Sequence, residues 1–160
     1  MRFHRAATVI GLGLTMLGAA RAGAQDLEVS SMDVLRTQLG VDKRVVVEEN
    51  LILTESAAAA FWPIYEEYQR ELLSIDERVV RLVNEYVAAY GNDSITDATA
   101  KRLLDEALAL DEAEIALRKR YAARLIQVIP AIEAARYLQI ERKIRAVVEF
   151  DLADRIPLIE

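Results

Sequence analysis

Pairs of neighbouring carboxylates are the side chains of this chain that could most readily do chemistry. Two carboxylates that face each other can cleave a glycosidic bond or hold a divalent cation. Residues adjacent on a helix point about 100° apart, so these pairs would not face each other. We interpret them as a solvated charged face, with Glu67 pairing to Arg70 and Glu114 to Arg118 along one helix. The pairs are Glu66-Glu67, Asp105-Glu106 and Asp111-Glu112, with Glu114 close by.

The side chains that most enzymes and metal sites use are scarce. The chain has no cysteine, which excludes thiol chemistry and thiolate metal sites. Its single histidine, His4, lies in a segment that we expect to be removed. Neither a glycine-rich phosphate loop nor a serine elbow occurs. We therefore predict no catalytic, cofactor or metal site and no enzyme activity, with a hydrolase built on paired carboxylates as a minor alternative.

A compact aromatic set surrounds Pro63. Phe61, Trp62, Tyr65 and Tyr68 fall within eight residues, and the set holds the only tryptophan of the chain. One hypothesis is a protein-binding site, in which these four side chains contact apolar client segments. Two arginines further along the same helix, Arg78 and Arg81, would supply nearby charge. The alternative is a core cluster at a bend, because proline inside a helix removes a backbone donor and bends or divides it.

The elements that would position these residues are long helices. The spacing of apolar residues predicts one helix over Thr54–Tyr90, a second over Thr96–Ile129 capped by Ser94 or Thr96, and a third from Pro130. About five residues separate the first two, so they should pack antiparallel. We predict an all-α fold: an elongated antiparallel helical hairpin with a third long helix. Helices this long suggest a homodimer, in which a second copy completes the bundle.

One or two short helices should precede the hairpin. Met32–Leu39 is one candidate, ended by Gly40. A second begins at Asp42, although its three consecutive valines at 45–47 also favour a strand. No partner strand is evident in the chain, so we predict a helix there. We expect residues 25–40 to form a flexible leader and residues 41–160 a single all-α domain.

The first 24 residues have the pattern of a secretory signal peptide. A basic start is followed by an uncharged stretch from Ala6 to Ala20 and by the small residues Ala22-Gly23-Ala24. The stretch is shorter than the roughly 20 apolar residues of a membrane span. We predict cleavage near Ala24-Gln25, a periplasmic location and no stable membrane insertion afterwards, with an uncleaved anchor as the alternative. Cleavage would leave 17 basic and 26 acidic side chains, and a net charge of −9 argues against binding nucleic acid.

Several short motifs resemble one known family. The chain is similar to the LTxxQ-motif family of periplasmic proteins, which includes Spy-type and CpxP-type envelope-stress proteins. It is more closely similar to exported bacterial proteins that are placed near that family. The glutamine position of the family motif falls at Ala57 here. The matching residues are Leu53-Thr54, Phe61-Trp62-Pro63, Tyr65, Ala135-Arg136-Tyr137, Gln139-Ile140-Glu141 and Ile156-Pro157-Leu158.

The resemblance implies a function in protein binding. Together with the expected compartment and the amphipathic helices, it predicts ATP-independent, chaperone-like binding of unfolded or stress-damaged envelope proteins. The alternative is a regulatory or structural protein that docks on one envelope sensor or assembly. The sequence names neither the client nor the partner.

Overall fold

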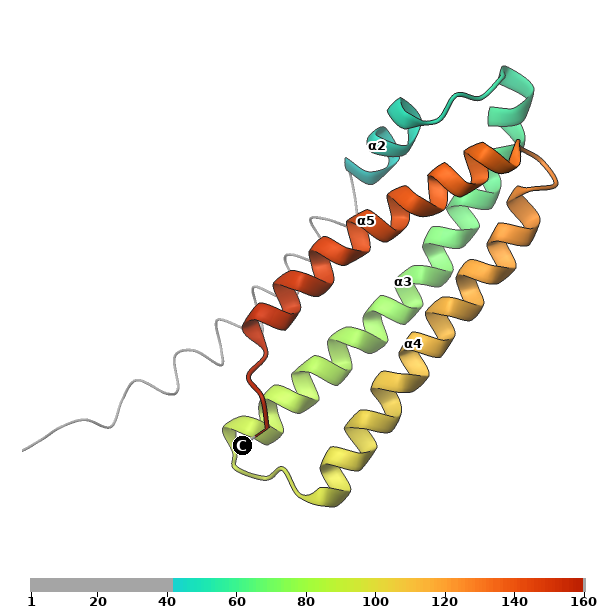
Figure 1. Cartoon of the computed structure of the whole chain (residues 1–160). Coiled ribbons are helices and arrows are strands. Elements are labelled where there is room, and N and C mark those ends of the chain that lie inside the picture. The colour runs from blue at the N-terminus through green and yellow to red at the C-terminus, as the bar shows by residue number, and fades with distance from the viewer. Residues whose placement is uncertain (1–41, 160) are drawn as a thin grey trace, which may run out of the picture.

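A computed structural model describes residues 42–159 as four helices, α2 to α5, and no strand occurs among these residues (Figure 1). The all-α prediction is confirmed. The predicted signal peptide, leader and Met32–Leu39 helix lie outside the described residues. The helices are α2 (Asp42–Asn50), α3 (Glu55–Gly91), α4 (Asp97–Leu125) and α5 (Ala131–Arg155).

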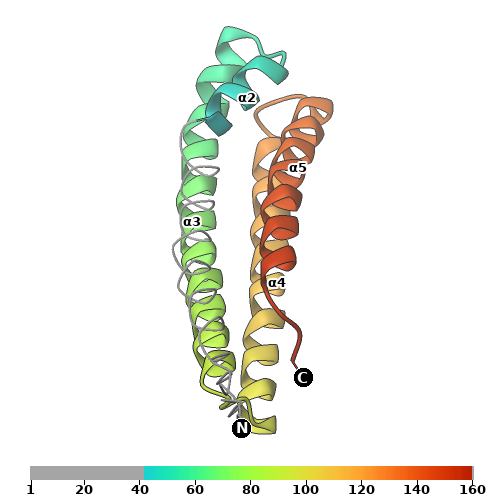
Figure 2. The ribbon, with the colours of Figure 1, turned by 90° about the vertical axis from the view of Figure 1, so that its left-hand side faces the viewer.

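The long helices form the predicted hairpin. Helices α3 and α4 run antiparallel, with the first turns of α3 extending beyond the end of α4, and α5 turns back along the half of the hairpin that is distant from the α3–α4 loop (Figures 1 and 2). Helix α2 lies against the N-terminal half of α5. None of the helices in residues 42–159 is long and apolar enough to cross a membrane.

The segment Asp42–Asn50 forms the predicted helix and not the strand that its valines also favoured. In a helix, Lys43 and Val47 are one turn apart and share a face, and both are buried. Val45 and Val46, which a strand would have split between its two sides, are both exposed. Burial of one face against α5 therefore overrides the strand preference of the valines.

Local signals define most of the helix ends. The Thr54 side chain accepts a hydrogen bond from the Ala57 amide at 3.3 Å and caps α3, and Thr96 caps α4 through the Thr99 amide at 3.2 Å. Of the two predicted caps, Thr96 is therefore the one used. Asp93 has a left-handed φ of 52° in the turn that follows α3.

Two prolines bear on the helix boundaries. Of the two expected effects of Pro63, division of the helix does not occur, because α3 is continuous through it. Ala59 and Pro63 are both exposed, so the Ala59 carbonyl that loses its amide partner can bond to water. Helix α4 ends at Leu125 rather than Ile129, and residues 126–129 form turns that lead to Pro130, before which the helical region is disfavoured. Pro130 then precedes α5 as its N-cap.

The core follows a heptad pattern along α3. Its buried side chains alternate in steps of four and three residues, which keeps them on one face. Helix α4 contributes leucines seven residues apart, and α5 contributes Ala134, Tyr137, Val148 and Leu152. Beyond the end of α5, the C-terminal tail continues along the hairpin, and the Tyr86 hydroxyl donates to the Pro157 carbonyl at 2.6 Å (Figure 2). The heptad residues are Phe61, Tyr65, Tyr68, Leu72 and Ile75 on α3, with Leu103, Leu110 and Leu117 on α4.

Ion pairs cross the hairpin on its outer flank. The predicted Glu67–Arg70 pair is wrong: Glu67 bonds to Arg124 of α4 at 2.6 Å. The same flank holds a bond between Arg120 and Glu71 and another between Arg102 and Glu85. All of these side chains are at least 40% exposed, so each pair contributes at most about 1 kcal/mol. These ion pairs contribute more to the alignment of α3 with α4 than to the free energy of unfolding.

Candidate functional site

The aromatic set predicted as a binding surface lies inside the bundle. Phe61 and Tyr68 are 0% and 1% exposed, and Tyr65 is 6% exposed. The structure therefore gives these three side chains the core position that was the alternative to binding. Trp62 is the member that reaches the surface, where the Arg44 guanidinium lies 4.2 Å from the centroid of its ring.

Edge-to-face contacts join these aromatic rings to the other helices. The Phe61 and Tyr137 ring centroids are 5.2 Å apart, and so are those of Tyr68 and Tyr121. Such pairs contribute about 0.5–1.5 kcal/mol each beyond the area that they bury. The cluster thus ties α3 to α4 and to α5. Heptad spacing is the same for a core and for a binding stripe, so the sequence could not separate the two.

The two predicted arginines lie apart from the aromatic set. Arg78 follows Tyr68 by ten residues, or about 15 Å along the helix axis, and it bonds to Glu106 of α4 at 2.9 Å. Arg81 is exposed. Both line an open, charged groove on the α3–α4 flank with Glu85, Arg102, Asp105 and Glu106. The prediction that they charge the aromatic site is wrong, and Arg44 is the residue that does so.

A buried polar network joins α2, α3 and α5 next to the aromatic cluster. Lys43 and Glu141, whose side chains are 2% and 3% exposed, form an ion pair at 2.6 Å. Gln69 accepts from Lys43 at 2.9 Å and donates to Glu141 at 2.8 Å and to the Tyr137 hydroxyl at 3.2 Å. Every member of this network has a partner, which satisfies the requirement for burying charge.

A second ionic cluster surrounds Arg145 of α5. Its guanidinium bonds to Asp76 of α3, to Glu114 of α4 at 2.7 Å and to Glu149 at 3.4 Å. The predicted pair of Glu114 with Arg118 is present at 3.8 Å, but the Glu114 side chain is only 12% exposed. Burial raises the pKa of Asp76, and the charge of Arg145 offsets part of that effect. Glu114 is therefore an interior bridge between helices rather than part of a solvated face.

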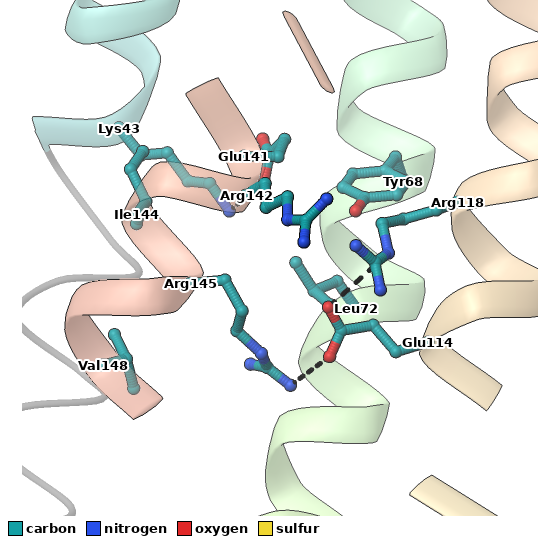
Figure 3. A pocket seen from close by; sticks show the side chains of 10 residues that line it. All are labelled: Lys43, Tyr68, Leu72, Glu114, Arg118, Glu141, Arg142, Ile144, Arg145 and Val148. Atoms are coloured by element: carbon teal, nitrogen blue, oxygen red, sulfur yellow. Dashed lines mark ion pairs between the residues drawn. The ribbon is translucent and has the colours of Figure 1, made fainter. Parts of the chain in front are cut away.

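A small cavity separates the two networks (Figure 3). Its volume is about 10 Å³, close to the space of one water molecule and far below the roughly 300–1,000 Å³ of sites for organic ligands. Four cationic and two acidic side chains face it. The lining residues are Lys43, Tyr68, Leu72, Glu114, Arg118, Glu141, Arg142, Ile144, Arg145 and Val148.

Apolar side chains are prominent on the outside of the bundle. On α4, Leu104, Leu108 and Ile115 are 58%, 53% and 45% exposed, and we call these three residues the α4 stripe. Their spacing of four and seven residues places them on one helical face. Within residues 42–159, no group of three His, Cys, Asp or Glu residues is placed to hold a metal ion.

These features define an elongated helical bundle with a closed aromatic core, two interior ionic networks and exposed apolar residues. Comparisons of the chain with models of protein families, with curated proteins and with solved structures found no match.

Alkaline pH should unfold this bundle through its buried tyrosines. Burial raises the pKa of Tyr65 to about 12 and also raises the pKa of Tyr68 and Tyr137, and the Glu141 charge adds to all three shifts. These pKa values are higher in the folded chain than in the unfolded chain. The three tyrosines therefore contribute their full stabilisation of the fold below about pH 10, and this contribution is lost as the pH rises through the folded-state pKa values. Each of these tyrosines then lowers the free energy of unfolding by up to about 1.4 kcal/mol per pH unit.

The measurement is a spectrophotometric tyrosinate titration followed in parallel by circular dichroism. We expect these three tyrosines to ionise together with the loss of helix, at about pH 12 or above. Ionisation of all six tyrosines near pH 10 in a chain that is still helical would contradict their burial.

Proposed function

We propose that the protein is an ATP-independent, chaperone-like protein of the periplasm that binds apolar segments of unfolded envelope proteins. The α4 stripe carries this proposal. Three large aliphatic side chains lie along one helical face, each 45% exposed or more. Exposed apolar residues that gather on one face are typical of protein-binding sites, whereas single exposed apolar residues are ordinary.

The surroundings of the stripe suit weak and exchangeable binding. Lys101, Asp111, Glu112 and Lys119 are exposed on α4 and provide both signs of charge. An apolar centre with a polar rim is the usual composition of a protein interface. We therefore assign the client contacts to the outer face of α4 and not to the buried aromatic residues. The proposed clients remain unfolded envelope proteins, as predicted from the sequence.

Aggregation of an unrelated, chemically denatured protein, followed by light scattering without ATP, tests this proposal. We expect suppression that saturates near equal molar amounts. The triple variant Leu104→Gln, Leu108→Gln and Ile115→Gln should lose most of the suppression, since it removes the apolar contacts and keeps good helix formers. Circular dichroism checks that the variant remains helical.

The matched control is the double variant Leu158→Gln and Ile159→Gln. These residues are 87% and 55% exposed on the C-terminal tail, so the same chemical change is made away from α4. The control should suppress aggregation as the unchanged protein does. Equal suppression by the triple variant would exclude the α4 stripe. No suppression by the folded parent would reject the chaperone proposal and favour one dedicated envelope partner.

A further inference from the structure

Helix α2 runs antiparallel to α5, and this direction determines where the chain before α2 begins its course. Lys43 pairs with Glu141 at 2.6 Å, and further along the chain the Ile52 amide donates to Glu133 at 3.1 Å. Residue numbers therefore rise along α2 as they fall along α5 (Figure 1). The chain that precedes Asp42 joins α2 at the end that lies closer to the C-terminal half of α5.

An apolar face begins one helical turn beyond Lys43. Gln69 of α3 and Glu141 of α5 hold the Lys43 ammonium. Four residues after Gln69 comes Leu73. Three residues after Glu141 comes Ile144, which is half-buried and lines the same cavity as Lys43 (Figure 3). We call this surface the α3–α5 face, and it consists of Leu73, Val80, Ile144 and Val147.

Both helices continue this face toward the C-terminal half of α5. Val80 lies seven residues after Leu73, on the same side of α3, and packs against the buried residues Val148 and Leu152 of α5. Leu73 and Val147 are 52% and 57% exposed. The described helices therefore leave this apolar face open.

Residues 32–39, which lie outside the described part, have a pattern that suits such a face, and we call them the N-terminal segment. Met32, Leu35 and Leu39 are three and four residues apart, so a helix over the segment carries them on one side. A helix this short is marginal in water by itself, so it needs to bury its apolar side. Only two residues separate the segment from α2.

We propose that the N-terminal segment forms a helix that docks on the α3–α5 face and extends the line of α2. At 1.5 Å per residue, Leu39 lies about 6 Å and Met32 about 17 Å beyond Lys43 along this line. Leu73 and Val80 lie at the same two distances beyond the α3 residue that binds Lys43. Because the segment is attached to α2 and matches this spacing, we assign the face to it and not to a second copy or a client. The face is separate from the α4 stripe.

Amide hydrogen exchange of the full chain, followed by mass spectrometry of its peptides, tests the docking. A docked helix exchanges only when it opens, so the N-terminal segment should exchange at least about ten-fold more slowly than an unstructured chain. This protection should not change with protein concentration, because the contact lies within one chain. Absence of protection would overturn the proposal. Protection that grows with concentration would also overturn it, since a second copy would then cover the face.

Two double variants assign the protection to the face. Leu73→Gln with Val147→Gln removes apolar contacts at exposed positions and should reduce the protection of the N-terminal segment at least about five-fold. The matched control is Leu104→Gln with Leu108→Gln, at residues of the α4 stripe that are 58% and 53% exposed. The control should keep full protection, whatever its effect on client binding. Undiminished protection in the first variant would mean that the segment packs elsewhere and would refute the docking.

Discussion

Replacing Glu141 by alanine should lower the free energy of unfolding by about 3–5 kcal/mol. The reason is that Lys43, with a side chain only 2% exposed, would keep its charge in the interior and lose its 2.6 Å partner. Gln69 would remain as its hydrogen-bond acceptor, but an amide oxygen does not neutralise an ammonium. Since domains of this kind are stable by about 5–15 kcal/mol in total, the loss is large. Urea unfolding followed by circular dichroism measures it.

A double variant separates the contribution of the ion pair from the cost of leaving one buried charge without its partner. Lys43→Met combined with Glu141→Leu replaces both charges by apolar groups and should recover most of the lost stability. The control is Asp105→Ala, which breaks the exposed pair with Lys101, whose two side chains are 74% and 60% exposed. It should change stability by less than about 1 kcal/mol. If Glu141→Ala merely frees α2, amide exchange would rise in α2 alone, and the predicted global loss would be refuted.

Replacing Phe61 by alanine should cost about 3–5 kcal/mol, because Phe61 is 0% exposed and packs edge-on against Tyr137 at 5.2 Å. Removing the ring leaves a cavity between α3 and α5 that the remaining aromatic rings are too rigid to fill. Phe61→Leu keeps most of the volume and should cost less than about 1.5 kcal/mol. The same urea titration ranks the two variants.

The Phe61→Ala variant also distinguishes a core position of the aromatic set from a role in protein binding. Ile132→Ala, at a residue 67% exposed on α5, is the control and should change stability by less than about 0.5 kcal/mol. A Phe61→Ala variant that is as stable as the parent but binds denatured client less well would restore the original binding hypothesis. Loss of stability at unchanged client binding would establish the core position.

Cations and acids are distributed in the structure in a way that helix spacing could not predict. Glu67 has Arg70 one turn away, yet it bonds to Arg124 of the facing helix. Glu114 does pair with Arg118, but its stronger bond is to Arg145 of α5. Neighbours along one helix are visible in a sequence, whereas neighbours on facing helices depend on the rotation and register of packing.

The sequence by itself determined the helices and their order. Capping threonines at 54 and 96, the turn after Gly91 and the proline at 130 act on backbone groups within about four residues, so their effect is local. The heptad spacing on α3 determined which of its faces is apolar.

Only the tertiary structure decided which apolar face is covered. Helix α5 packs over Tyr68 and leaves Leu104 and Leu108 of α4 in solvent, although all three lie on helices with apolar residues three and four positions apart. It also brought Lys43 to Glu141 and Arg145 to Asp76 across long separations in the chain. The physical reason is that burial depends on the summed fit of three helices, and no single segment of the chain contains that information.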